Sequence, residues 1–110
     1  MEKANVWIIT EDSLDVTKDN GRYPMTNRGF AIAVCDTKET AIEFANKHIK
    51  GEMDLANRAD DGFGGVNVYT ENITADQVNT WVTYMKVTDQ EDGKSFEYSI
   101  RITNWMVLGN

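Results

Sequence analysis

Polar and apolar residues alternate in two stretches near the end of the chain, and this period of two is typical of β-strands with one buried face. The stretches are residues 79–88 and 96–103, and the turn dipeptide Asp92-Gly93 lies between them. A turn centred on that dipeptide pairs residues whose numbers sum to 185, which predicts an antiparallel hairpin. The face predicted to be buried carries Thr83, Met85, Val87, Tyr98, Ile100 and Ile102, and the solvent face carries Tyr84, Lys86, Thr88, Glu97, Ser99 and Arg101.

Three shorter apolar stretches predict the other strands, at residues 5–10, 28–36 and 66–70. Within residues 28–36, both faces are apolar, which is typical of a central strand buried on both sides: one face carries Phe30, Ile32 and Val34, and the other carries Ala31, Ala33 and Cys35. Residues 11–27, between the first two strands, are long for a hairpin connection. We therefore expect either a functional loop or an extra irregular hairpin in that stretch.

Residues 37–50 carry apolar side chains on one side of a helical wheel, which predicts one amphipathic helix. Asp36 or Thr37 can cap its first turn, and Asp36 with Glu39 has the spacing of a capping box. Gly51 follows at the position where a glycine commonly ends a helix.

Together these elements predict a single α+β domain over residues 1–110. Its antiparallel sheet has about five strands, one main helix lies on one face, and the order is β-β-α-β-β-β. A short helical turn is expected from Thr74. In the apolar tail, Trp105 and Val107 fall on the solvent face, so we expect another chain or the 11–27 loop to cover that end.

The composition is that of one folded domain. The chain has 110 residues, of which 41% are hydrophobic, so it can form a core and is not disordered by composition. No apolar run is long enough to span a membrane, and the N-terminus does not resemble a signal peptide. The one cysteine cannot form an internal disulfide, which favours a cytoplasmic location.

The charge is acidic and unevenly distributed. The net charge of −7 disfavours nucleic acids and anionic membranes as partners. Residues 36–76 carry nine acids and four bases, a net charge of −5, whereas residues 1–35 and 77–110 each carry −1. This middle third is either a solvated surface or a patch for a basic partner.

Few residues are candidates for chemistry. The carboxylate of Asp36 disfavours the thiolate of Cys35, so we interpret Cys35 as structural and a catalytic Cys35–His48 pair as the weaker alternative. His48 lies in the apolar arc of the helix, and we expect it to be half-buried with a hydrogen-bond partner. A zinc site would need more Cys and His than the chain contains, and no glycine stands in a calcium-loop pattern. The sequence therefore predicts no catalytic residue, no cofactor and no metal site.

The stretches NVWIITEDS and AVCDTKETAIEFANKHI, within residues 5–50, resemble a pattern found in small bacterial and phage-encoded proteins of unknown function. The resemblance implies a small accessory protein of a phage or mobile element, and it carries no catalytic residues. Some small acidic phage proteins inhibit nucleic-acid-binding host defences by occupying basic grooves.

These observations lead to three hypotheses. The first is a non-enzymatic binding protein, an inhibitor engaging a basic surface of a nucleic-acid-handling partner. The second is a ligand-binding or enzymatic domain walled by residues 11–27 and 52–65. The third is a structural homodimer formed through Trp105–Leu108. The partner-binding candidates of the first are Glu39, Glu43, Glu52, Asp54, Asp60 and Asp61; the site candidates of the second are Asp12, Asp15, Tyr23, Arg28 and His48.

Overall fold

The computed structural model describes residues 3–17, 23–24, 29–58, 63–89 and 93–108. Its elements in chain order are β1 (Lys3–Asp15), β2 (Tyr23–Pro24), β3 (Phe30–Cys35), α1 (Lys38–Arg58), β4 (Phe63–Val68), the 3-10 turn η1 (Ala75–Gln77), β5 (Val82–Asp89) and β6 (Ser95–Leu108).

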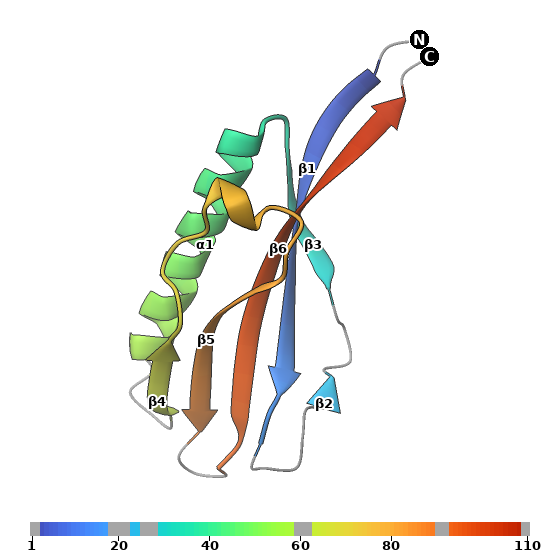
Figure 1. Cartoon of the computed structure of the whole chain (residues 1–110). Coiled ribbons are helices and arrows are strands. Elements are labelled where there is room, and N and C mark those ends of the chain that lie inside the picture. Colours follow the sequence, from blue (N-terminus) through green and yellow to red (C-terminus); the bar gives the residue numbers. More distant parts are fainter. Residues whose placement is uncertain (1–2, 18–22, 25–28, 59–62, 90–92, 109–110) are drawn as a thin grey trace.

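One antiparallel sheet contains all these strands, with β1 and β6 side by side near its centre (Figure 1). β6 lies between β1 and β5, and β4 forms the edge beyond β5. On the other side, β2 and β3 each pair with β1 at different points along its length. The predicted α+β fold, with one main helix and the order β-β-α-β-β-β, is confirmed, and the two-residue β2 is an addition to it.

The core lies between α1 and one face of the sheet (Figure 1). The apolar side of α1 is buried at Ala41, Ala45, Ile49 and Met53. Burial of Ile49 and of Met53 contributes about 1.5–3 kcal/mol each relative to the exposed state, and each alanine contributes less because it has less apolar area, so this contact holds the helix on the sheet. The sheet residues buried in the same core include Ile9, Tyr84, Met85, Val87, Ile100 and Ile102.

β1 and β6 are the longest strands, with 13 and 14 residues, and they pair along their whole length. Near the chain termini the pair extends beyond α1 as a two-stranded ribbon (Figure 1). In it Trp105, Met106 and Val107 are 56%, 59% and 49% exposed. The described part of the chain, which includes residues 11–17 of the predicted 11–27 loop, therefore does not bury Trp105 or Val107.

β3 is an edge strand, so the prediction of a central strand at residues 28–36 is wrong. Within the described residues β3 pairs with β1 alone, and Phe30 and Val34 are 55% and 63% exposed. A register shift leaves Ile32 outside the ladder, which interrupts the alternation of the strand. Apolar residues on both faces did not identify a central strand, because apolar atoms also make up much of any protein surface.

The hairpin of β5 and β6 is confirmed, but its predicted register is wrong. Near the turn, Met85 pairs with Tyr98, so the paired numbers sum to 183 and not to 185. The N–H of Asp89 donates to the carbonyl of Lys94 at 2.7 Å, and Gly93 adopts a positive φ of 73°. The connection is therefore longer than a two-residue turn, and Gly93 supplies its left-handed position.

A bulge further along β5 exchanges the predicted faces of Thr83 and Tyr84. Thr83 pairs with Ser99 and Met85 pairs with Tyr98, which leaves Tyr84 as the extra residue. Tyr84 turns inward and is 0% exposed. The hydroxyls of Thr83 and Ser99 are hydrogen-bonded at 2.9 Å on the opposite face.

α1 runs eight residues beyond its predicted end at residue 50. The cap is Thr37, one of the two predicted candidates, whose Oγ1 accepts a hydrogen bond from the N–H of Thr40 at 3.1 Å, rather than Asp36 with its capping box. Gly51 lies inside the helix, and Met53, 7% exposed, continues the buried stripe beyond it. Burial of that stripe outweighs the weak helix propensity of one glycine, about 1 kcal/mol.

The two stretches predicted as loops are partly regular structure. β1 occupies residues 11–15, and β2 pairs back onto its end, so the extra irregular hairpin is the alternative that the described residues bear out. α1 occupies residues 52–58 of the second stretch. The short turn expected from Thr74 is confirmed as η1, with the N–H of Thr74 donating to Gln77 Oε1 at 2.9 Å.

Candidate functional site

Glu11, His48 and Glu52 converge where α1 packs on β1. His48 Nε2 lies 2.6 Å from Glu11 Oε2 and 3.8 Å from Glu52 Oε1. The side chains of Glu11, His48 and Glu52 are 14%, 21% and 32% exposed. The predicted half-buried histidine with a hydrogen-bond partner is therefore confirmed.

The local structure explains why these groups meet. Side chains alternate along β1, so Glu11 projects from the same face as the buried Ile9, toward α1. His48 and Glu52 are four residues apart on α1 and therefore share one side of the helix. Tyr84, turned inward by the bulge, donates a hydrogen bond from its hydroxyl to Glu11 Oε1 at 3.3 Å.

The two carboxylates make this cluster electronegative. The hydrogen bond to Glu11 raises the pKa of His48, and the charges of Glu11 and Glu52 add to this effect against the opposing effect of burial. Burial is the main cause that raises the pKa of Tyr84, and the charges of Glu11 and Glu52 raise it further. The pKa of Tyr98 is raised by burial first and then by the charges of Glu52 and Glu11. The cluster therefore favours a positive charge on or near His48, and both phenols keep their protons.

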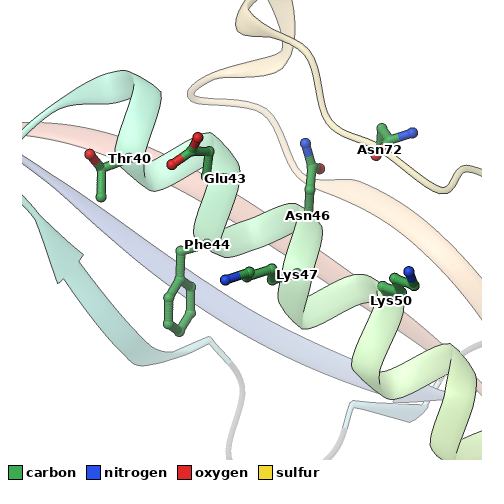
Figure 2. A pocket seen from close by; sticks show the side chains of 7 residues that line it. All are labelled: Thr40, Glu43, Phe44, Asn46, Lys47, Lys50 and Asn72. Carbon is green, nitrogen blue, oxygen red and sulfur yellow. The ribbon is translucent and has the colours of Figure 1, made fainter.

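A second feature is an open groove of about 580 Å³ on the outer side of α1. Figure 2 shows its side chains along the helix, with Asn72 on the neighbouring segment. Asn46 fixes that segment, since its Oδ1 accepts from the N–H of Ile73 at 2.7 Å and its Nδ2 donates to the Ile73 carbonyl at 3.3 Å. The groove is lined by Thr40, Glu43, Phe44, Asn46, Lys47, Lys50 and Asn72.

The predicted partner-binding acids do not share one surface. Glu39, Glu43 and Asp54 are exposed on the outer side of α1. Glu52 instead turns toward His48 and is half-buried. Asp60 and Asp61 lie outside the described residues.

The residues proposed for a ligand pocket are not brought together in the described part of the chain. Asp12 is buried on β1, on the face opposite Glu11, and Asp15 accepts a hydrogen bond from the N–H of Thr17 at 2.9 Å. Neither these two aspartates nor His48 lines one of the described cavities. Arg28 and the side chain of Tyr23 lie outside the described residues.

Cys35 ends β3 as a buried residue, 9% exposed. Burial raises the pKa of its thiol, and the charge of Asp36 raises it further. Both effects reduce the thiolate fraction near neutral pH, which agrees with the predicted structural role.

We expect native Cys35 to react with iodoacetamide at pH 8 at least about tenfold more slowly than in denatured protein, because the thiolate is the reacting species. The rate should keep rising with pH above the range where an ordinary thiol is fully ionised. Mass spectrometry of timed samples measures it, with the protein in guanidinium chloride as control. A native thiol that reacts as fast as the denatured one at pH 8 contradicts this assignment.

Comparison with protein-family models, with curated proteins and with solved structures found no match to this chain. The resemblance over residues 5–50 therefore stays a prediction. Among the described helices, none combines the length and the apolar character that crossing a membrane requires.

Sequence reasoning missed the roles of Glu11 and Tyr84 in the cluster. Glu11 lies 37 residues from His48 in the chain, and Tyr84 lies 73 residues from Glu11. A signal was present in the four-residue spacing of His48 and Glu52. A zinc pattern built from Cys and His alone does not include this pair, because one of its two members is a carboxylate.

Proposed function

We propose that this chain is a non-enzymatic cytoplasmic binding module whose helix-side surface engages a basic surface of a partner protein. We define the helix-side surface as the exposed residues of α1, of the two positions before it and of residues 69–76. The observation that carries the proposal is the placement of the exposed acids. In the part of the chain whose side-chain burial the structure describes, every exposed acid lies on this surface. These acids are Asp36, Glu39, Glu43, Asp54, Glu71 and Asp76.

The same surface carries three exposed bases, Lys47, Lys50 and Arg58, so its exposed charges sum to −3. This net negative charge suits a partner surface with an excess of Lys and Arg. The groove in Figure 2 lies within the surface and gives it a concave region for a protruding side chain. The resemblance to small phage proteins adds the role we propose for such binding, which is inhibition of a nucleic-acid-handling partner.

The partner can be captured at this surface by a photo-cross-linking residue at position 43. A matched probe at Asn67, which is exposed on β4 outside the surface, serves as control. The proposal expects a cross-linked protein from host extract at position 43 and not at position 67. Nucleic acid added to the purified partner should then compete with this chain, and its failure to compete contradicts the inhibitory role.

Reversing two charges with Glu39→Lys and Glu43→Lys should weaken binding to the purified partner about tenfold or more at low salt. The wild-type affinity should fall as salt rises, because exposed charges are screened. Lys47→Glu on the same surface should strengthen binding, and Asn67→Lys should leave it unchanged. Isothermal titration measures all four proteins after circular dichroism has shown that each is folded; a wild-type affinity independent of salt contradicts the proposal.

A second candidate function is a structural homodimer through Trp105–Leu108. It is favoured by the exposure of Trp105 and Val107 on one face of the ribbon, since clustered exposed apolar residues mark interaction surfaces. Light scattering distinguishes the two states, because a monomer has a mass of 12.4 kDa. Trp105→Ser should convert a dimer to that mass, and a wild-type monomer at high concentration removes this candidate.

A further inference from the structure

Glu11, His48 and Glu52 place one ligand atom each within 4.8 Å of one another. Glu11 comes from β1, and the other two come from one side of α1. We propose that this cluster binds one divalent transition-metal ion of the zinc class. The site lies where α1 packs on β1, and it does not depend on the function proposed for the helix-side surface, although Phe44 both lines the groove of that surface and stacks on His48.

The donor set determines the class of metal. An imidazole nitrogen suits Zn²⁺ and its neighbours in the first transition series, whereas Mg²⁺ and Ca²⁺ prefer oxygen ligands alone. The two carboxylates balance the charge of a divalent ion. Zinc with ligands at about 2.0–2.2 Å and tetrahedral angles holds those ligands about 3.4 Å apart. The distances from His48 Nε2 are 2.6 and 3.8 Å, and no two of the three ligand atoms are more than 4.8 Å apart, so side-chain movements of about 1.4 Å or less bring all three to this spacing.

An ordinary ion pair accounts for only part of this geometry. His48 Nε2 carries one hydrogen at most, and the bond to Glu11 at 2.6 Å uses it. Glu52 nevertheless approaches the same nitrogen, at 3.8 Å. A cation placed between the two carboxylates and this ring nitrogen would contact all three groups at once.

Neighbouring aromatic residues hold the ligands in place, as the residues behind metal ligands commonly do. The hydroxyl of Tyr84 donates to Glu11 Oε1 and leaves Oε2 directed at His48. The ring of Phe44 stacks on the ring of His48, with 6.4 Å between the ring centroids and an angle of 7° between the ring planes. All three ligands are partly exposed, so solvent can reach the ion and supply a water molecule as a fourth ligand.

Zinc binding can be tested directly on protein without a histidine tag, stripped with a chelator. The Cys35→Ser background removes the one thiol that competes for zinc. Titration calorimetry with zinc chloride should show one ion per chain, and the melting temperature should rise with zinc concentration. A large excess of Mg²⁺ should neither displace the zinc nor reproduce the shift.

Glu11→Gln, His48→Gln and Glu52→Gln should each weaken zinc binding at least about tenfold. Glu52→Gln is the decisive variant, because it leaves the Glu11–His48 bond in place and is the least disruptive to folding. Glu43→Gln, which removes one acid from the outer side of α1, is the matched control and should bind as wild type does.

NMR provides a second readout. Because His48 is the one histidine of the chain, every imidazole nitrogen signal in the spectrum belongs to it. Saturating zinc should shift the Nε2 signal to a metal-bound position. Folded wild-type protein that binds no zinc overturns the proposal. So does zinc binding that persists unchanged in Glu52→Gln or that leaves the His48 signals unmoved.

Discussion

Tyr84→Ala is expected to lower the free energy of unfolding by about 3–5 kcal/mol, the usual loss when a large aromatic side chain is removed from a core. Tyr84 is 0% exposed and is among the largest fully buried side chains of the described residues. Guanidinium denaturation followed by far-ultraviolet circular dichroism measures the change. A strand that alternated without a bulge would expose Tyr84, and the substitution would then change stability by no more than about 0.5 kcal/mol.

Two further variants test the hydroxyl of Tyr84 and the position of the bulge. Tyr84→Phe keeps the ring but loses the 3.3 Å hydrogen bond to Glu11, and it should cost about 1 kcal/mol. Thr83→Ala loses the hydrogen bond to Ser99 on the opposite face and should cost about 1 kcal/mol or less. If Thr83→Ala is instead the more damaging of the two alanine substitutions, the bulge is not where the structure places it.

Gly51→Pro is expected to destabilise the protein by about 3 kcal/mol or more, since proline in a helix interior removes a hydrogen bond and clashes with the preceding turn. Gly51→Ala should instead stabilise it by about 0.5–1 kcal/mol, because alanine is the better helix former and the added Cβ meets no atom within 4 Å apart from its chain neighbours and the backbone of the helix itself. Chemical denaturation of both variants measures these opposite signs. A glycine that ended the helix in the left-handed conformation would make Gly51→Ala destabilising.

Gly93→Ala is the matched control for that experiment. Its Cβ would also meet nothing within 4 Å, but its φ is +73°. The substitution should therefore cost about 1–2 kcal/mol from backbone conformation alone. Opposite signs at Gly51 and Gly93 would establish that α1 continues through residue 51 and that the left-handed position lies in the hairpin. A stabilising Gly93→Ala contradicts the second point.

Much of the fold was predictable from local patterns. The alternation at Met85, Val87, Ile100 and Ile102 identified their buried face correctly, and all four are at most 2% exposed. That face survived an error of two in the register, because a shift of two residues keeps every side chain on the same side of a strand. The half-buried state of His48 followed in the same way from its angle on the helical wheel.

The candidate metal site was not predictable from the same patterns. His48 and Glu52 are visible as a pair on one helix, but nothing in the periodicity of α1 says which strand it covers. Glu11 was part of a stretch predicted as a loop, and Tyr84 was placed on the solvent face. Glu11 meets His48 and Glu52 because α1 packs on β1, and Tyr84 joins them from β5.

The sequence by itself determined the α+β class, the two antiparallel strands of the hairpin and the start of the helix, because these depend on periodicities within a few residues. The tertiary structure decided the inward turn of Tyr84, the passage of α1 through Gly51 and the edge position of β3. It also joined Glu11 to His48 across 37 residues of chain. These outcomes depend on which surfaces meet and how much apolar area each contact buries, and that balance is set by the whole core and not by any local stretch of sequence.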